Sequence, residues 1–338
     1  MKSTRKPLAV AAVLALPLVL AACGDDDGGD SGGSDSGVEL TLAHSYTEDQ
    51  PQHTCGAQVI KDEVEAADVG VTVEIYPNSQ LGGDADRIAS VQSGDVDIDI
   101  QGASALAAVY EPIGVLDAAY AFADSDQLQT FMDSDAGTQL ATDFKDASGV
   151  NVLGAWSAGA RQFTANDPIR SPEDLDGLRM RFPGSPQFLL NAKALGAQAT
   201  EVAYEELYLA LQQGVVDGQE NPITNIDSSN LVEVQDYLSM SNHQLNSNLV
   251  VAGGTYDDLT DEQRQAVDDA VASAVEQMPG CVEDAEQEIL DGWESEGSIE
   301  IVDDVDTEAF STQADAWFRA NLEGDSLKVY EDIKATQQ

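Results

Sequence analysis

The stretch GLRMRFPGSPQFLLNAKALG, residues 177–196, predicts a strand followed directly by a helix. Arg179 and Arg181 alternate with apolar residues, which is the period of a β-strand. Ser185 followed by proline is typical of a helix N-terminus, and Gly196 is typical of the position just after a helix. A strand that leads into a helix is the repeating unit of α/β folds, so the middle of the chain is expected to form an α/β unit.

The earlier part of the chain contains the same pattern twice. Residues 38–45 (VELTLAHS) and 71–77 (VTVEIYP) alternate as strands, and the segment 57–67 between them has helical spacing. Residues 84–102 (DADRIASVQSGDVDIDIQG) repeat the helix and the strand. Strand, helix and strand in about forty residues favour a parallel sheet. We therefore expect a first α/β domain before the second unit.

A long amphipathic helix is predicted near the C-terminus, over residues 259–297. Thr260 and Gln263 have the spacing of a capping box, and apolar residues follow at helical intervals. Pro279 lacks the N–H that a helix interior needs. We therefore expect a kink or a break near Met278.

The first residues, MKSTRKPLAVAAVLALPLVLAAC, indicate a secreted protein. A cationic start and an apolar run that ends before Cys23 are typical of a signal peptide, and the run is too short to span a bilayer. Small residues before Cys23 resemble a lipobox, which predicts that this cysteine is lipidated. Residues 24–37 contain only Gly, Asp and Ser, so we expect a disordered tether. The alternative is an apolar anchor that is never cleaved.

Two further cysteines, Cys55 and Cys281, are available for a disulfide. An oxidising compartment makes a bond between them the expected outcome. The sequence alone does not show that they meet, and two free thiols are the alternative. A bond would require the late part of the chain to return to its starting domain.

The composition narrows the classes of function. The chain has 62 acidic residues against 15 lysines and arginines, a formal net charge of −47. Phosphates would be repelled, so nucleic acid is excluded as a partner. A solvated acidic surface is typical of salt-adapted proteins, and stability is expected to rise with salt. His44, His53 and His243 have no metal-ligand spacing with cysteine, and the motifs HExxH and CxxC are absent, so we expect no metal, cofactor or catalytic residues.

The two arginines of the opening stretch are candidates for an anion site. They precede a helix N-terminus, where unpaired N–H groups and the helix dipole favour an anion. An arginine there can hold a carboxylate with two parallel hydrogen bonds. Ion pairs with the abundant acids are the alternative, and the spacing does not rank Arg179 against Arg181. Trp156 and Tyr204 lie near the turns that frame the arginines and are candidates for a pocket wall or for the core.

Four segments in this order resemble the DctP family, the solute-binding proteins of tripartite ATP-independent periplasmic (TRAP) transporters. They are YPNSQLGGD (76–84), GARQFTANDPIRSPEDLDGLRMRFPGSP (159–186), ALGAQATEVAYEELYLALQQGVVDGQENP (194–222) and MSNHQLN (240–246). The resemblance implies a two-lobed fold like that of periplasmic binding proteins, with mixed sheets flanked by helices, a ligand cleft between the lobes and a long late helix spanning both.

The resemblance also implies which residues bind the ligand. Arg181 matches the carboxylate-binding arginine, Arg161 a second cleft arginine and Asn221 a polar contact. Weaker matches are His44, Ser45, Asp84, Trp156 and Tyr204. Arg179 is then left to pair with an acid such as Asp176. Gly102 stands where sialate-binding members carry an acid, which makes sialate less fitting.

The expected function is that of a monomeric extracytoplasmic receptor, anchored by its lipid to the outer face of the cell membrane. It would bind a mono- or dicarboxylate and deliver it to the TRAP membrane subunits. The alternatives are the binding protein of an ATP-driven (ABC-type) uptake system and a secreted enzyme that acts on small acids. The expected segments are a signal peptide (1–22), lipidated cysteine and tether (23–37), domain I (38–157), domain II (158–246), a return to domain I (247–286) and a C-terminal helical region packing on domain II (287–338).

Overall fold

The computed structural model describes residues 37–337. The predicted signal peptide, the lipidation site Cys23 and nearly the whole tether lie outside the described residues. Between Gly37 and Gln337, no helix has the length and apolar character needed to cross a membrane.

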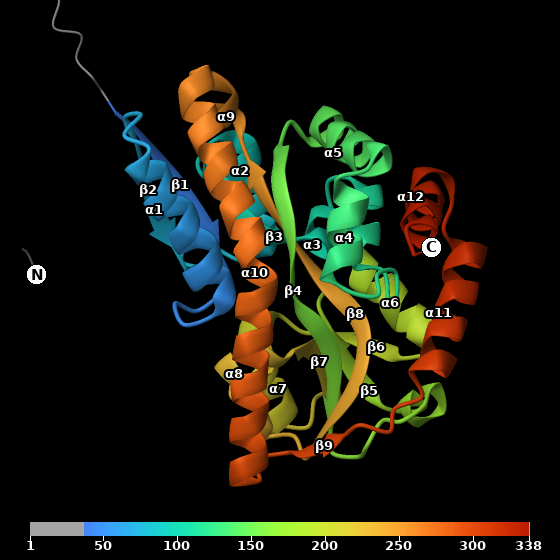
Figure 1. Ribbon diagram of the computed structural model, residues 1–338. Helices are drawn as coiled ribbons and strands as arrows, with labels where there is room; N and C mark the ends of the chain where they lie inside the picture. Colours follow the sequence, from blue (N-terminus) through green and yellow to red (C-terminus); the bar gives the residue numbers. More distant parts are fainter. Residues whose placement is uncertain (1–36, 338) are drawn as a thin grey trace, which may run out of the picture. The chain divides into compact units, whose positions relative to one another are not determined.

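One mixed sheet runs through the described chain, with the order β2-β1-β3-β8-β4-β7-β5-β6 and with β9 beside β8 (Figure 1). The strands are β1 (Val38–His44), β2 (Val71–Tyr76), β3 (Ile98–Gly102), β4 (Asn151–Ala165), β5 (Arg179–Phe182), β6 (Gln198–Glu201), β7 (Gly218–Pro222), β8 (Tyr237–Ala252) and β9 (Glu300–Val302). The α/β class predicted from the sequence is confirmed.

Helices flank this sheet. The α-helices are α1 (Gln58–Ala66), α2 (Asp84–Ser93), α3 (Ala103–Leu106), α4 (Ser125–Met132), α5 (Asp135–Ser148), α6 (Pro186–Leu195), α7 (Leu207–Gln212), α8 (Ile223–Ser228), α9 (Gly254–Asp258), α10 (Asp261–Glu296), α11 (Thr307–Asn321) and α12 (Gly324–Ala335). The π- and 3-10 turns are η1 (Gln52–Ala57), η2 (Glu111–Asp117), η3 (Pro172–Leu175), η4 (Tyr204–Glu206) and η5 (Leu231–Glu233).

The two ends of the sheet form two lobes. In the first lobe β1 pairs in parallel with β2 and β3, and in the second lobe β5 pairs in parallel with β6 and β7. The long antiparallel strands β4 and β8 belong to both lobes, because β8 also pairs with β3 and β4 also pairs with β7.

The pairing of β4 with β8 is irregular at the crossover between the lobes. The register shifts between Ser157 and Ala160, and Gly159 has a left-handed φ of +94°. A bulge bends a strand and increases its twist, which lets one strand serve two differently oriented lobes. The domain boundaries that we place after residues 157 and 246 lie beside this shift, and the division into domains stays a prediction.

Helix α10 runs without interruption for 36 residues, with Pro279 inside it. The predicted capping box of Thr260 and Gln263 is present. Of the kink or break expected near Met278, the break is wrong, and the kink stays a prediction. Proline in a helix interior costs about 3 kcal/mol or more. Buried Val271 and Met278 hold the helix before Pro279, and buried Val282 holds it beyond.

The disulfide between Cys55 and Cys281 joins η1 to this helix, with 6.6 Å between the two Cα atoms. Helix α10 contacts η1, α1 and β4 in the first lobe and α8 beside the second, so it extends along both (Figure 1).

The C-terminal helices do not pack on the second lobe alone. Helix α11 packs against α6, but α12 contacts η2 and α5, which lie within residues 38–157 of the expected domain I. Residues Phe310, Phe318 and Tyr330 from these helices join one buried apolar cluster with Phe131 and Phe144. The segment 287–338 therefore bridges elements of both expected domains, which differs from our prediction.

Candidate functional site

A cavity of about 420 Å³ lies between the two lobes. Its walls come from the segments that follow β1, β2, β3, β5, β6 and β7, and from residues of β4 and β8. Parallel strands of an α/β sheet end at a common edge, and ligands of such folds bind at that edge. The volume lies within the range of small-molecule sites, roughly 300 to 1,000 Å³.

Arg181 of β5 supplies a buried positive charge to this cavity. Its side chain is only 2% exposed, and its Nε donates to the carbonyl oxygen of Val202 at 2.9 Å. Its Nη1 is buried without a hydrogen-bond partner, and no carboxylate of residues 37–337 forms an ion pair with it. Burial lowers the pKa of Arg181 to about 10. An anion in the cavity would therefore meet an unpaired guanidinium.

Arg179 lies two residues earlier in the same strand but does not reach the cavity. It is exposed, and its Nε donates to Oδ2 of Asp217 at 2.9 Å. The expected ion pair of Arg179 with an acid is therefore present, and the acid is Asp217, not the suggested Asp176. The backbone N–H of Arg179 also donates to Asp217 at 2.8 Å, so the acid beside β7 is fixed next to this arginine by both groups.

Arg161 of β4 also lines the cavity, but its charge is already paired. Its guanidinium holds both carboxylate oxygens of buried Glu220, with Nη2 to Oε1 at 2.8 Å. Further donation goes to Oδ1 of Asn246 at 2.9 Å and to Oδ1 of Asn221 at 3.1 Å. The ring of Phe188 lies 4.7 Å from its guanidinium carbon. Arg161 is thus a part of the wall whose charge Glu220 neutralises.

Glu220 is held from a second side by His243. Nε2 of His243 lies 3.3 Å from Oε2 of Glu220, and the imidazole stacks on Phe163 at 4.1 Å between ring centroids. Burial opposes the charge of Glu220, but the charge of Arg161 and these hydrogen bonds outweigh it and lower the pKa of Glu220. The sequence analysis missed this pair, because an acid inside GQENP gives no sign of its partner 59 positions earlier.

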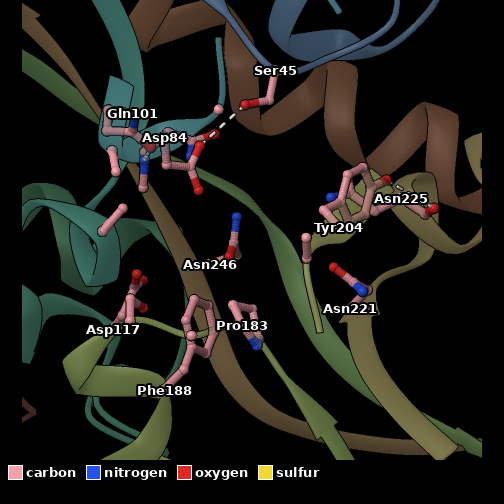
Figure 2. Close-up of a pocket in the computed structure, with 18 of the residues that line it drawn as sticks. Ser45, Asp84, Gln101, Asp117, Pro183, Phe188, Tyr204, Asn221, Asn225 and Asn246 are labelled. Carbon is pink, nitrogen blue, oxygen red and sulfur yellow. Dashed lines mark hydrogen bonds between the residues drawn. The ribbon is translucent and has the colours of Figure 1, made fainter. Parts of the chain in front are cut away.

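The first lobe brings Ser45 and Asp84, two of the weaker matches of the resemblance, together at the cavity, and their contact with a ligand stays a prediction. Oδ1 of Asp84 accepts from Oγ of Ser45 at 3.2 Å and from Nη2 of Arg87 at 3.0 Å (Figure 2). Arg87 is buried and also donates from Nε to buried Asp99 at 2.9 Å. One guanidinium therefore serves two carboxylates.

Asp117 is a second acid in the wall, and the sequence analysis missed it. It accepts from the backbone N–H of Ser104 at 2.8 Å and from that of Ser247 at 2.7 Å. Burial raises the pKa of Asp117 to about 6. Its place at the end of η2 could not be read from any motif, because 62 acids occur in the chain.

Amide and aromatic side chains complete the walls. Tyr204 and Asn221 lie there as expected, and Figure 2 shows them with Asn225 on the side of the cavity opposite Asp84 and Asp117. Other wall residues that the sequence analysis missed are Tyr46, Gln50, Gln101, Pro183, Phe188, Asn225, Asn246 and Asn248. Most follow the ends of strands, and that position is the signal that could have found them.

Two expected ligand contacts do not line the cavity. His44 is fully buried, and its Nε2 lies 3.1 Å from Nδ1 of His53. Burial lowers the pKa of His44 to about 3, with the charges of His53 and Arg87 acting in the same direction. It is therefore a neutral structural residue.

Trp156 belongs to the apolar core under α10, not to the cavity wall. It shares a face of β4 with Gly154, because side chains two apart in a strand point to one side. A methyl group at Gly154 would lie 2.7 Å from Val271 of α10. The face that Trp156 occupies is thus the one that the long helix covers.

No group of three or more His, Cys, Asp or Glu side chains in the described range 37–337 could hold a metal ion. Within residues 37–337 the wall offers the unpaired guanidinium of Arg181, the carboxylates of Asp84, Asp86, Asp117 and Glu205, and several amides. A few polar groups placed in a cavity of this kind suit reversible binding of a small anion through the guanidinium.

The family model for bacterial extracellular solute-binding proteins, family 7 (DctP), matches residues 42–324. The chain belongs to this family. Its fold agrees, since the structure of a TRAP periplasmic solute-binding protein of Roseobacter denitrificans with bound L-galactonate superposes with a TM-score of 0.81 at 32% identity, over 88% of this chain and 98% of that one.

Other relatives of this family 7 protein differ in the ligands that their names record. A TRAP solute-binding protein of Polaromonas sp JS666, bound to D-erythronate, has a TM-score of 0.80 and 28% identity, over 89% of this chain and 98% of that one. The C4-dicarboxylate-binding periplasmic protein of Rhodobacter capsulatus is 30% identical, over 78% of this chain and 79% of its own. Relatives that bind monocarboxylates and a relative named for dicarboxylates thus have similar sequence identities to this chain.

Proposed function

We propose that this family 7 protein captures a small organic acid outside the cytoplasm and delivers it to the membrane subunits of a TRAP transporter. The observation that supports it best is the unpaired, buried guanidinium of Arg181 beside a cavity of about 420 Å³. Relatives bound to L-galactonate and D-erythronate, and a relative named for C4-dicarboxylates, support a carboxylate as the ligand.

The mechanism follows from desolvation. A guanidinium that is removed from water without a counter-ion carries a large free-energy cost, which shows in the lowered pKa of Arg181. A carboxylate that accepts two parallel hydrogen bonds from Arg181 removes this cost. The ligand therefore stabilises the state in which both lobes enclose it, and this closed state is the one that we expect the membrane subunits to recognise.

We further propose that the protein acts as a monomeric receptor and catalyses no reaction, and that lipidation at Cys23 anchors it to the outer face of the cell membrane. Family members are solute-binding proteins, which supports a receptor. Stable one-to-one binding with the acid recovered unchanged is expected, and product formation would favour a secreted enzyme. Replacement of Cys23 by Ala should release the protein from the membrane fraction.

The test of the binding role uses two arginines of the same strand. A panel of mono- and dicarboxylates is first screened by thermal shift, and the acid that binds is titrated calorimetrically. Arg181→Ala should weaken its binding at least about a hundredfold, since losing one partner of a buried ion pair costs about 3 to 5 kcal/mol. Arg179→Ala is the matched control and should leave the affinity unchanged. Equal affinities for the wild type and Arg181→Ala would reject the proposal.

A further inference from the structure

The charges that face the cavity are arranged unequally on its two walls. The second lobe contributes Arg181, which donates a hydrogen bond to the carbonyl oxygen of Val202. Val202 lies two residues before Tyr204, which lines the same wall. Four acids line the cavity as well: Asp84, Asp86, Asp117 and Glu205, of which Asp117 is buried and the other three are exposed. Figure 2 shows Asp84 and Asp117 on one side of the cavity and Tyr204, the neighbour of Glu205 in the chain, on the other.

Among the cations that residues 37–337 place in the wall, only Arg181 is free to bind a carboxylate. Arg161 already holds both oxygens of Glu220, and it donates to Asn246 and Asn221 as well. Breaking that arrangement would leave Glu220 as a fully buried, less compensated charge, which is costly. The cavity therefore offers a single carboxylate site, at Arg181.

The opposite wall carries excess negative charge. Asp84 and Asp99 both pair with the guanidinium of Arg87. The single positive charge of Arg87 therefore balances only one of their two negative charges. Asp117 makes hydrogen bonds to two backbone N–H groups and forms no ion pair within residues 37–337. A second carboxylate of a ligand would be brought against these acids, and like charges at close range cost several kcal/mol.

Amide donors stand among these acceptors. Oδ1 of Asn246 accepts from Arg161, and Figure 2 shows its amide in the middle of the cavity between Asp84 and Asp117. Oδ1 of Asn248 accepts from the hydroxyl of Tyr46 at 2.8 Å, while its Nδ2 is buried without a partner. A hydroxyl group both donates and accepts, whereas an ammonium only donates. Free carboxylate acceptors beside free amide donors therefore match hydroxyl groups.

We propose that the ligand is a monocarboxylate with several hydroxyl groups, held by Arg181 at its carboxylate and by Asp84, Asp117 and the neighbouring amides at its hydroxyls. This inference rests on the proposed function and narrows its ligand class. It excludes dicarboxylates of the same length as preferred ligands, although both kinds of ligand occur among the relatives.

The test uses pairs of acids that differ only at the second end. Galactonate is compared with galactarate, and erythronate with meso-tartrate, by calorimetric titration of the wild-type protein at pH 7.5. In any pair that binds, the monocarboxylate should bind at least about tenfold more tightly, because the second carboxylate faces Asp84 and Asp117. A dicarboxylate that binds equally or more tightly overturns the inference. So does tighter binding of succinate or of an α-amino acid, or failure of all four hydroxy acids.

A pair of variants tests whether the preference for monocarboxylates comes from the acids of the wall. Asp84→Asn should reduce the ratio of the two affinities at least about threefold by removing one negative charge. Asp95→Asn removes the same charge from an exposed site at the far end of α2 that does not line the cavity, and should leave the ratio unchanged. An unchanged ratio in Asp84→Asn overturns the assignment.

Failure of this inference can be told apart from failure of the proposed function. If a dicarboxylate is preferred and Arg181→Ala still abolishes its binding, the receptor role stands and the monocarboxylate inference is wrong. If Arg181→Ala leaves the binding of every acid intact, the proposed site itself is wrong.

Discussion

Arg161 and Glu220 form an ion pair in which the acid is completely buried and the arginine is 3% exposed. The pair links β4 to β7 at the cavity wall, and His243 from β8 supports it. This pair neutralises the second arginine of the wall, so within the described part of the chain the free positive charge of the cavity belongs to Arg181.

Glu220→Gln should destabilise the protein by about 3 to 5 kcal/mol, because it leaves Arg161 buried without its counter-ion. Urea unfolding followed by circular dichroism measures this change. Asp217→Asn breaks the exposed pair with Arg179 and is the control, with an expected loss of less than about 1 kcal/mol. A Glu220 variant as stable as the wild type would contradict the role of this pair.

Removing the disulfide should lower the stability of the protein without changing its affinity for the ligand. The bond closes a loop across 226 positions, and such cross-links typically contribute about 2 to 5 kcal/mol. The double variant Cys55→Ser, Cys281→Ser should therefore unfold at a lower urea concentration, while its affinity for the acid is retained because neither cysteine lines the cavity. A reducing agent should lower the midpoint of the wild type and leave that of the double variant unchanged.

Lowering the pH should weaken the discrimination against dicarboxylates. Burial raises the pKa of Asp117 to about 6, so this acid is charged at pH 7.5 and mostly neutral at pH 5. The ligand carboxylates, with ordinary pKa values near 3.5, stay charged over that range. The affinity of galactarate relative to galactonate should rise as the pH falls through about 6. Asp117→Asn should reduce this rise, and the part that remains belongs to Asp99, which shares Arg87 with Asp84 and whose pKa burial also raises to about 6. A ratio that falls as the pH is lowered in the wild type would contradict the proposed orientation of the ligand.

Salt should stabilise the protein and speed up ligand capture. With a formal net charge of −47, the acidic residues of the chain repel one another and repel an approaching acid. Salt screens both repulsions, with a screening length of about 10 Å at 0.1 M. Thermal unfolding and stopped-flow binding at 0.1 M and 1 M KCl measure them. Slower association at 1 M would show that local positive charge outweighs the acidic surface.

The pattern of the sequence was sufficient for the class of fold and for most of the local structure. Helix α2 ends before the left-handed Gly94, α6 ends before the left-handed Gly196, and Thr260 caps α10 as expected. These helix ends and caps depend on residues that are close together in the chain, so the sequence pattern is sufficient to predict them. The continuity of α10 through Pro279 was not predicted, because its tertiary contacts outweigh the local cost of proline.

The sequence by itself determined an α/β chain of strongly acidic character in which one of two arginines in LRMRF could bind an anion, and the resemblance pointed to Arg181. Only the tertiary structure decided that Arg179 is exposed beside Asp217, that Arg161 is neutralised by Glu220, and that Trp156 lies under α10. It also brought Asp84 and Asp117 to one wall. The physical reason is that burial and charge pairing depend on residues far apart in the chain, which periodicity and spacing do not describe.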